Sequence, residues 1–159
     1  MPFNTLLLNC LIHRTSFSEE GARVSIKRQP GEITLFFNID EQSNRKCGLR
    51  RTLGMGESVI CDLVVFHTHR DNDKKVICLV ELKGSDVKHA AKQVINTYQH
   101  FRKSLARPLL QRIDWKACIY LKGSAPKETK KVRQDLEKTF GRGKVNITSE
   151  SDLGRFLRG

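Results

Sequence analysis

Residues 61–83 read CDLVVFHTHRDNDKKVICLVELK, and they contain two apolar runs separated by a polar segment. The first run begins slightly earlier and covers Ser58–Phe66, and the second covers Val76–Lys83. Both are rich in Val, Ile and Leu, which favour strands, and the segment HTHRDNDKK between them suits a hairpin connection. Strands that are apolar on both faces are normally buried in a sheet. We therefore expect two successive buried strands here.

Three charged side chains, Asp62, Glu81 and Lys83, interrupt these runs. Ionised groups are costly in buried strands unless they are paired or bind a metal. Because side chains alternate along a strand, Glu81 and Lys83 share a face, and Asp62 joins them if residue 62 pairs with residue 79, 81 or 83. Two such carboxylates can bind Mg²⁺, and a neighbouring lysine can stabilise negative charge or orient an attacking water. The alternative is an ion pair of Glu81 with Lys83 at the strand end, with Asp62 capping a turn.

The overall charge indicates a polyanionic partner. The net charge is +12, from 29 Lys and Arg against 17 Asp and Glu, and the basic residues are spread along the chain. A folded basic domain most often binds nucleic acid. The alternative is a generally basic protein without such a partner.

Length and composition favour one domain over residues 1–159, with a helix and hairpin in 1–56, a core in 57–122 and a closing helix–strand–helix in 123–159. No apolar segment approaches the ~18–20 residues of a membrane span, and we expect no membrane partner and a cytoplasmic location.

The chain has five cysteines, and those in expected strands fit small core residues of a reducing compartment better than a disulfide framework or a zinc site. They are Cys61, Cys78 and Cys118.

Periodicity predicts the remaining elements. A run of strands followed by alternating helices and strands predicts an α/β fold, a mixed central sheet flanked by helices. The first half is expected to contain a helix over 3–14 with Leu7, Leu8, Leu11 and Ile12 on one face, a turn capped by Ser16 or Ser18, strands 23–28 and 33–39 joined as a hairpin at Pro30-Gly31, and a long loop over 40–57. The two central strands follow, and then a helix over 86–105 capped by Ser85 and a strand over 114–121. The chain is expected to close with a helix that Ser124 caps and that ends before Gly141, a strand over 144–148 and a helix over 151–157.

Asp62, the triplet Glu81-Leu82-Lys83 and the glycine and helix that follow resemble the PD-(D/E)xK nuclease superfamily. The resemblance covers residues 57–122, and it departs from the family pattern at Cys61, where the family name has proline. It implies a restriction-endonuclease-like core and a Mg²⁺-dependent endonuclease, in which Mn²⁺ can replace Mg²⁺. Asp62, Glu81 and the backbone carbonyl of Leu82 would bind the metal, and Lys83 would assist catalysis.

The resemblance also implies further site residues. A carboxylate from the first helix often joins the metal site in this superfamily, and Glu20 or its neighbour Glu19 is the candidate, with Glu57 as a second. Two solvated glutamates at a helix start explain Glu19 and Glu20 equally well. Gln93, on the helix after the triplet, matches a glutamine that contacts the active site in one branch. The branch has a tyrosine four residues later, whereas Tyr98 follows by five, which favours a core role for Tyr98.

Two groups of basic residues are expected to contact nucleic acid, one in the loop 40–57 and one on the helix after the triplet. The alternative for the loop is a disordered connector. The competing functions are a non-catalytic basic nucleic-acid-binding module and a nuclease-like subunit of a larger defence or repair complex, and cleavage of both strands would suggest a homodimer. The expected contacts are Arg45, Lys46, Arg50 and Arg51 in the loop, and Lys88 and Lys92 on the helix.

His67, His69, Asp71 and Asp73 could also bind a metal. However, no second group of ligands completes a tetrahedral set, and a polar hairpin tip explains these residues equally well.

Overall fold

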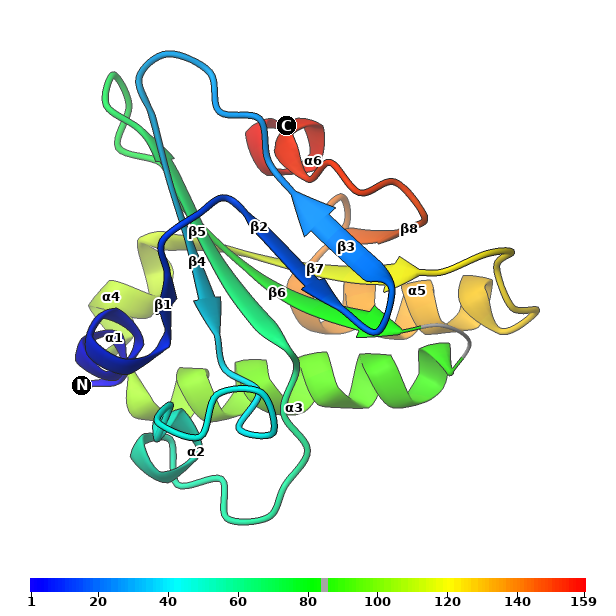
Figure 1. The fold of residues 1–159 in the computed structure, drawn as a ribbon, viewed down its shortest axis with the longest axis horizontal. Coiled ribbons are helices and arrows are strands. Elements are labelled where there is room, and N and C mark those ends of the chain that lie inside the picture. Colours follow the sequence, from blue (N-terminus) through cyan, green and yellow to red (C-terminus); the bar gives the residue numbers. More distant parts are fainter. Residues whose placement is uncertain (84–85) are drawn as a thin grey trace.

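A mixed sheet forms the centre of the protein, whose computed structural model describes residues 1–83 and 86–159, with only the backbone at Lys83. Within these residues the sheet has six strands in the order β1-β4-β5-β6-β7-β8 (Figure 1). The pairs from β1 to β6 are antiparallel, and β6-β7 and β7-β8 are parallel. This confirms the predicted α/β class. The strands are β1 (Leu11–Ile12), β4 (Glu32–Asn38), β5 (Leu63–His69), β6 (Lys75–Lys83), β7 (Ile113–Leu121) and β8 (Val145–Thr148).

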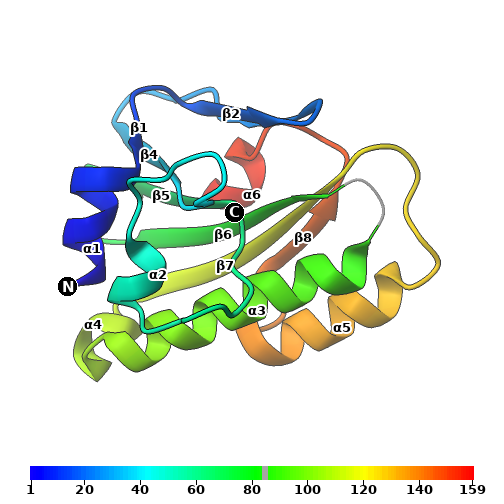
Figure 2. The same ribbon diagram turned by 60° about the horizontal axis from the view of Figure 1, so that its bottom comes forward.

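Different elements cover the two faces of the sheet, as Figure 2 shows. The long helices α3 (Val87–Ser104) and α5 (Thr129–Phe140) pack on one face. A separate hairpin of β2 (Ser16–Glu19) and β3 (Ala22–Ser25) lies on the other face, together with the short helix α6 (Gly154–Arg158).

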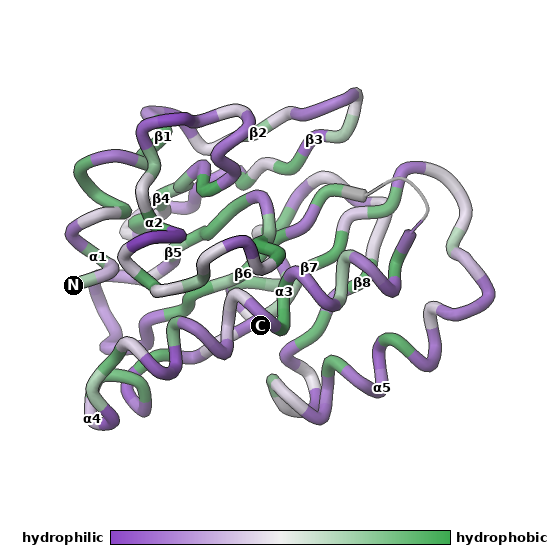
Figure 3. Tube along the Cα trace, turned by 90° about the horizontal axis from the view of Figure 1, so that it is seen from below, coloured by the Kyte–Doolittle hydropathy of each residue, from purple (hydrophilic) through white to green (hydrophobic). Residues whose placement is uncertain are grey.

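Two hydrophobic clusters fill the two interfaces. Alternate residues of β6 enter different clusters: Ile77 and Leu79 pack on the helical side, and Cys78 and Val80 on the hairpin side. The central strands are therefore apolar on both faces because both faces are covered. In Figure 3 the helices α3 and α5 alternate between green and purple, as expected for helices with one buried face.

The N-terminal segment differs from the single helix predicted over 3–14. The chain forms a four-residue α-helix, α1 (Pro2–Thr5), then a π-helical turn, η1 (Leu6–Cys10), and then enters β1. The predicted apolar face is wrong, since Leu7 and Leu8 are 51% and 82% exposed, whereas Leu6 and Cys10 are buried. The wider π-helical turn changes which side chains face inward.

The predicted pairing of strand 23–28 with strand 33–39 is also wrong. Both regions contain strands, but β3 pairs with β2 and β4 pairs with β5. Glu20 and Gly21 connect β2 to β3 with φ angles of 48° and 81°, the left-handed conformation of a tight two-residue hairpin. Ser16 and Ser18, predicted to cap a turn, lie within strand β2 instead.

The segment 40–57 contains a short helix, α2 (Leu49–Thr52), and four buried residues that join the cluster on the helical side. It is therefore packed against the core, and the alternative of a disordered connector does not hold. The packing residues are Cys47, Leu49, Leu53 and Met55.

The elements from β5 onward follow the predicted order with shifted ends. β5 begins at Leu63 rather than Ser58 and extends through His67 and His69, which were expected in the connecting loop. His67 is buried, and its Nδ1 lies 3.1 Å from the Thr34 hydroxyl. The side-chain bond to Thr34 accounts for His67 without a metal.

The helices after β6 show three further differences. The predicted cap Ser85 lies outside the described residues, and Asp86 caps α3 by accepting a 3.0 Å hydrogen bond from the His89 amide. A short helix, α4 (Arg107–Gln111), precedes β7 and was not predicted. α5 begins at Thr129 rather than after Ser124, and it ends at Phe140, with Gly141 just past its end as predicted. In the described part of the chain, no helix combines the length and the apolar character needed to cross a membrane.

Candidate functional site

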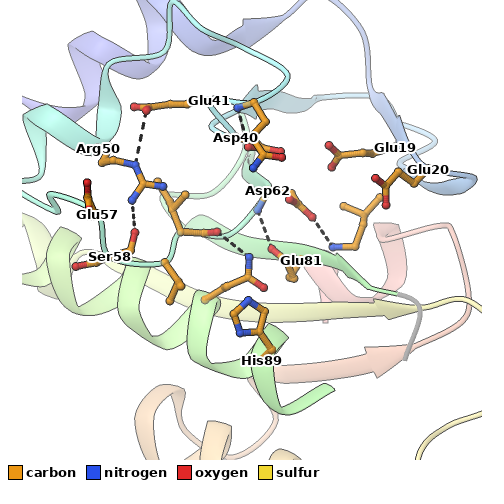
Figure 4. Close-up of a pocket in the computed structure, with 15 residues that line it drawn as sticks. Glu19, Glu20, Asp40, Glu41, Arg50, Glu57, Ser58, Asp62, Glu81 and His89 are labelled. Carbon is orange, nitrogen blue, oxygen red and sulfur yellow. Dashed lines mark hydrogen bonds and ion pairs between the residues drawn. The ribbon is translucent and has the colours of Figure 1, made fainter. Parts of the chain in front are cut away.

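A cavity of about 560 Å³ lies where β6 ends and β5 begins (Figure 4). The β2–β3 hairpin, the segment 40–62 and helix α3 form its walls. The chain carries only 17 acidic residues against 29 basic ones, so a concentration of carboxylates here creates a local field opposite to that of the whole protein. The described carboxylates that line it are Glu19, Glu20, Asp40, Glu41, Glu57, Asp62 and Glu81.

Asp62 and Glu81 lie opposite each other. Leu63 pairs with Val80, so residue 62 faces residue 81, which is one of the registers that place both side chains together. The Asp62 amide donates a 3.0 Å hydrogen bond to Glu81 Oε2, and the Leu82 amide donates a 2.9 Å bond to Asp62 Oδ2. The two side chains are only 8% and 1% exposed. Backbone donors thus hold both carboxylates in one orientation at the base of the cavity.

Glu19 and Asp40 complete a group of carboxylates with Asp62. One oxygen from each lies within 4.8 Å of the other two. Burial, followed by the nearby carboxylates of Asp62 and Asp40, raises the pKa of Glu19 from 4.5 to about 7. This crowding of negative charge would be relieved by a cation. Carboxylate oxygens are the donors that Mg²⁺ and Mn²⁺ prefer, so the residues present fit a hard divalent cation.

The candidates for an additional carboxylate occupy different positions. Glu19 ends β2 and faces Asp40 and Asp62, whereas Glu20 lies in the hairpin turn and is exposed (Figure 4). Glu57 is exposed on the opposite side of the cavity, beside Ser58. Of the three, Glu19 belongs to the carboxylate group with Asp40 and Asp62, although Glu20 and Glu57 also line the cavity. The strand and hairpin that deliver Glu19 replace the expected helix.

Helix α3 holds the segment that precedes Asp62. Gln93 Nε2 donates to the Ile60 carbonyl at 3.1 Å, and the Thr97 hydroxyl accepts from the Cys61 amide at 3.0 Å. Gln93 lines the cavity, and its Oε1 has no hydrogen-bond partner among the described residues. Gln93 thus lines the same cavity as Asp62 and Glu81.

Thr97 was missed by sequence reasoning. Its polar side chain on the buried stripe of α3 was the available signal, since such a hydroxyl needs partners. Tyr98 packs in the core, with its ring centroid 5.3 Å from that of Trp115.

The other two residues of the triplet, Leu82 and Lys83, are the last two residues of β6. Leu82 lines the cavity and donates its amide to Asp62. Lys83 is the last residue of β6, and its side chain lies outside the described residues.

A second cavity, of about 850 Å³, adjoins the acidic one and shares Glu41 and Arg50 with it. Arg45, Lys46 and Arg51 also line it, and none of the three forms an ion pair within the described residues. Arg50 instead lies 3.6 Å from Glu41 and donates to the carbonyl of Ser58. The loop therefore places unpaired cations beside the carboxylates, which suits an anionic ligand that spans both cavities.

Lys88 and Lys92 are not brought to these cavities. They line a separate groove between α3 and α5 together with Asp135. Helix α3 faces the acidic cavity with His89 and Gln93 instead. Asp40 and Glu41, which follow β4, were also missed, because the fold of the 40–57 segment brings them to the site.

Comparisons with models of protein families, with curated proteins and with solved structures gave no match for this chain. We therefore infer the function of the cavity from its own residues. Its recessed carboxylates suit a divalent cation, and its basic neighbour suits a polyanion.

Proposed function

We propose that the protein is a divalent-cation-dependent nuclease of the PD-(D/E)xK type that hydrolyses phosphodiester bonds, with DNA as the expected substrate. The observation that carries this proposal is the mutual anchoring of Asp62 and Glu81 through backbone amides, in a cavity lined by further carboxylates. The sequence triplet Glu81-Leu82-Lys83 supports the same assignment.

Asp62, Glu81 and Glu19 would hold the cation, with Asp40 beside them. When bound, Mg²⁺ supplies Lewis-acid stabilisation of the phosphate charge and a water of lower pKa. The protein's contribution is preorganisation: the two backbone hydrogen bonds fix the carboxylates before substrate arrives, so little reorganisation is needed.

Lys83 follows Glu81 by two residues on the same strand, and such residues share a face of the sheet. We therefore expect the ammonium group of Lys83 to stabilise charge on the scissile phosphate or to orient the attacking water. Gln93 lines the same cavity, and its buried Oε1, which has no hydrogen-bond partner among the described residues, could accept a hydrogen bond from a water or a substrate group that reaches it. Arg45, Lys46 and Arg51 would bind the adjoining phosphates, because they are unpaired and line the neighbouring cavity. Arg50 would act mainly by holding Glu41 and the Ser58 backbone.

The test is plasmid nicking. Purified protein is incubated with supercoiled DNA in Mg²⁺, in Mn²⁺ and in chelator, beside folded Asp62→Asn and Lys83→Ala variants. Glu150→Gln is the matched control, because it removes an exposed carboxylate that does not line the acidic cavity. We expect metal-dependent nicking that both site variants lose and the control retains.

Two outcomes would contradict this assignment. Cleavage that survives in chelator or in Asp62→Asn would place the activity elsewhere or in a contaminant. Absence of cleavage, with salt-sensitive DNA binding that Asp62→Asn leaves unchanged, would favour a non-catalytic binding module. An RNA substrate in the same assay separates the two nucleic acids.

A further inference from the structure

Cys10 and Cys47 lie side by side in the protein interior, with their sulfur atoms 2.8 Å apart. Cys10 ends η1, and Cys47 lies between Lys46 and Gly48 in the segment 40–57. Both are buried and both are free thiols. A disulfide bond measures about 2.05 Å, so the sulfurs would have to approach by less than about 1 Å to form one.

The other three cysteines provide a contrast within the same chain. Cys61, Cys78 and Cys118 are also buried, and burial raises the pKa of each. None of them has a hydrogen bond to another thiol in the described part of the chain. These are the features of unreactive core cysteines, so proximity to a second thiol singles out Cys10 and Cys47.

We propose that Cys10 and Cys47 form a redox-active modification site that closes reversibly to a disulfide when hydrogen peroxide oxidises the protein. The sulfur of Cys47 attacks one peroxide oxygen, which breaks the O–O bond and leaves a sulfenic acid on Cys47 and one water. The sulfur of Cys10 then attacks the Cys47 sulfur and displaces the second water. Two electrons pass from the thiols to the peroxide, and the two thiol protons end in the two waters.

The hydrogen bond between the thiols favours Cys47 as the first nucleophile. When Cys10 is the donor, this hydrogen bond lowers the pKa of Cys47, and the Leu49 amide and the Arg50 charge lower it further, against the opposing effects of burial and of the Glu41 charge. The same hydrogen bond, with burial, raises the pKa of Cys10. The thiolate is the reactive form of cysteine, and the asymmetry therefore gives the two residues different roles.

The pair also lies next to a route from solvent. Lys46 and Gly48, which flank Cys47, line the second cavity, of about 850 Å³, which we call the basic cavity because Arg45, Lys46 and Arg51 line it. Asn9, which precedes Cys10, lines it too. Both cysteines are thus direct chain neighbours of residues that line a cavity that a small peroxide can enter. A local opening of these lining residues exposes the two cysteines without unfolding the sheet.

The disulfide would add a covalent link between the N-terminal segment and the segment 40–57, which carries the cations of the basic cavity. At present the links between the N-terminal segment and residues 40–57 include Thr5 to Thr52 at 2.9 Å and the Asn44 side chain to the Asn9 carbonyl at 3.1 Å. Both are exposed and therefore weak. A covalent bond would close the loop from Cys10 to Cys47 and restrict the unfolded chain, and it would fix one wall of the basic cavity.

The experiment counts thiols and maps the bond, so its result does not depend on nuclease activity. The reduced full-length protein is treated with hydrogen peroxide, and free thiols are counted in denaturant before and after. We expect the count to fall from five to three, a Cys10–Cys47 cross-linked peptide in a non-reducing digest, and full recovery with dithiothreitol. For a loop of this length the melting temperature of the oxidised form should rise by roughly 5–15 °C.

Variants separate this pair from the other cysteines. Cys10→Ala and Cys47→Ala should give no cross-link, whereas Cys118→Ala is the matched control that should retain it. The wild-type thiol count is informative even if a variant folds poorly. Retention of all five thiols, a bond between other cysteines, or overoxidation of Cys47 without a cross-link would each overturn the proposal.

Discussion

The Asp62 amide donates a 3.0 Å hydrogen bond to Glu81 Oε2, and the Leu82 amide of β6 donates a 2.9 Å hydrogen bond to Asp62 Oδ2. Each carboxylate is therefore held by the backbone of the opposite strand. Backbone donors stabilise the ionised form of a carboxylate, which lets the fold keep two charges in a recessed position.

Asp62→Asn tests whether the cavity binds a cation. The amide oxygen of asparagine can still accept from the Leu82 amide, so the fold should persist. Mg²⁺ at about 100 times its dissociation constant should stabilise the wild type by about 2.7 kcal/mol and raise its melting temperature by roughly 5–10 °C. The variant should lose most of this shift. An equal Mg²⁺ shift in both proteins would show that the cation binds elsewhere.

Glu19→Gln and Glu20→Gln form a matched pair at adjacent positions. Glu19 belongs to the carboxylate group with Asp40 and Asp62, whereas Glu20 is exposed in the turn. We expect Glu19→Gln to weaken Mg²⁺ affinity at least tenfold, about 1.4 kcal/mol, and Glu20→Gln to change it little. Calorimetric titration with Mg²⁺ measures both affinities. A larger effect at Glu20 would assign the additional ligand to the hairpin turn.

Thr97→Val tests the support that α3 gives to the site. Valine has the shape of threonine but cannot accept from the buried Cys61 amide, which leaves that donor unsatisfied. The expected cost is about 1–3 kcal/mol, or roughly 3–10 °C in melting temperature. Thr97→Ser keeps the hydroxyl and should restore the hydrogen bond. Equal stability of the two variants would show that packing, and not the hydroxyl, matters at this position.

The ion pair of Glu32 with Arg158 predicts a specific acid dependence. Arg158 donates two hydrogen bonds to the carboxylate, at 2.5 and 3.0 Å, and this lowers the pKa of Glu32 from 4.5 to about 2. The folded state thus favours the ionised form, so the pair stabilises the protein above pH 4.5 and this contribution is lost as the pH falls toward 2. His67 also faces this carboxylate, at 3.7 Å.

Glu32→Gln should therefore cost about 1–3 kcal/mol at neutral pH and should lose stability less steeply between pH 4.5 and 2. Urea denaturation over this pH range measures both effects. Glu128→Gln, which changes an exposed carboxylate, serves as the control. The same acid dependence in Glu32→Gln and the wild type would exclude this pair as its source.

Arg45→Ala and Arg51→Ala test the basic cavity as a nucleic-acid contact. Each removes an unpaired cation that lines it, and each should weaken DNA binding and reduce the slope of log K against log salt by about one. Lys131→Ala removes an exposed cation from α5 and is the control. Fluorescence anisotropy at several salt concentrations gives the slopes. Equal losses in all three variants would indicate binding by overall charge only.

Local sequence patterns were sufficient for β6, α3 and β7, because strand alternation and helical spacing act over neighbouring residues. They were misleading for the N-terminal segment, where the spacing of Leu7 and Leu8 matched a helix although both are exposed. They also failed for β3 and β4, since a Pro-Gly turn indicates a reversal of the chain but not which strands pair. β4 pairs with β5, and β3 with β2.

The sequence by itself determined that Asp62 and Glu81 belong to two successive apolar runs, because such runs form buried neighbouring strands. The register that places the two side chains opposite each other came from the structure, in which Leu63 pairs with Val80. Only the tertiary structure decided that Glu19 and Asp40 join Asp62, that Thr97 supports the segment before it, and that Cys10 meets Cys47. These contacts join segments far apart in the chain. Their geometry depends on how the hairpin, the 40–57 segment and α3 cover the sheet, which no local pattern specifies.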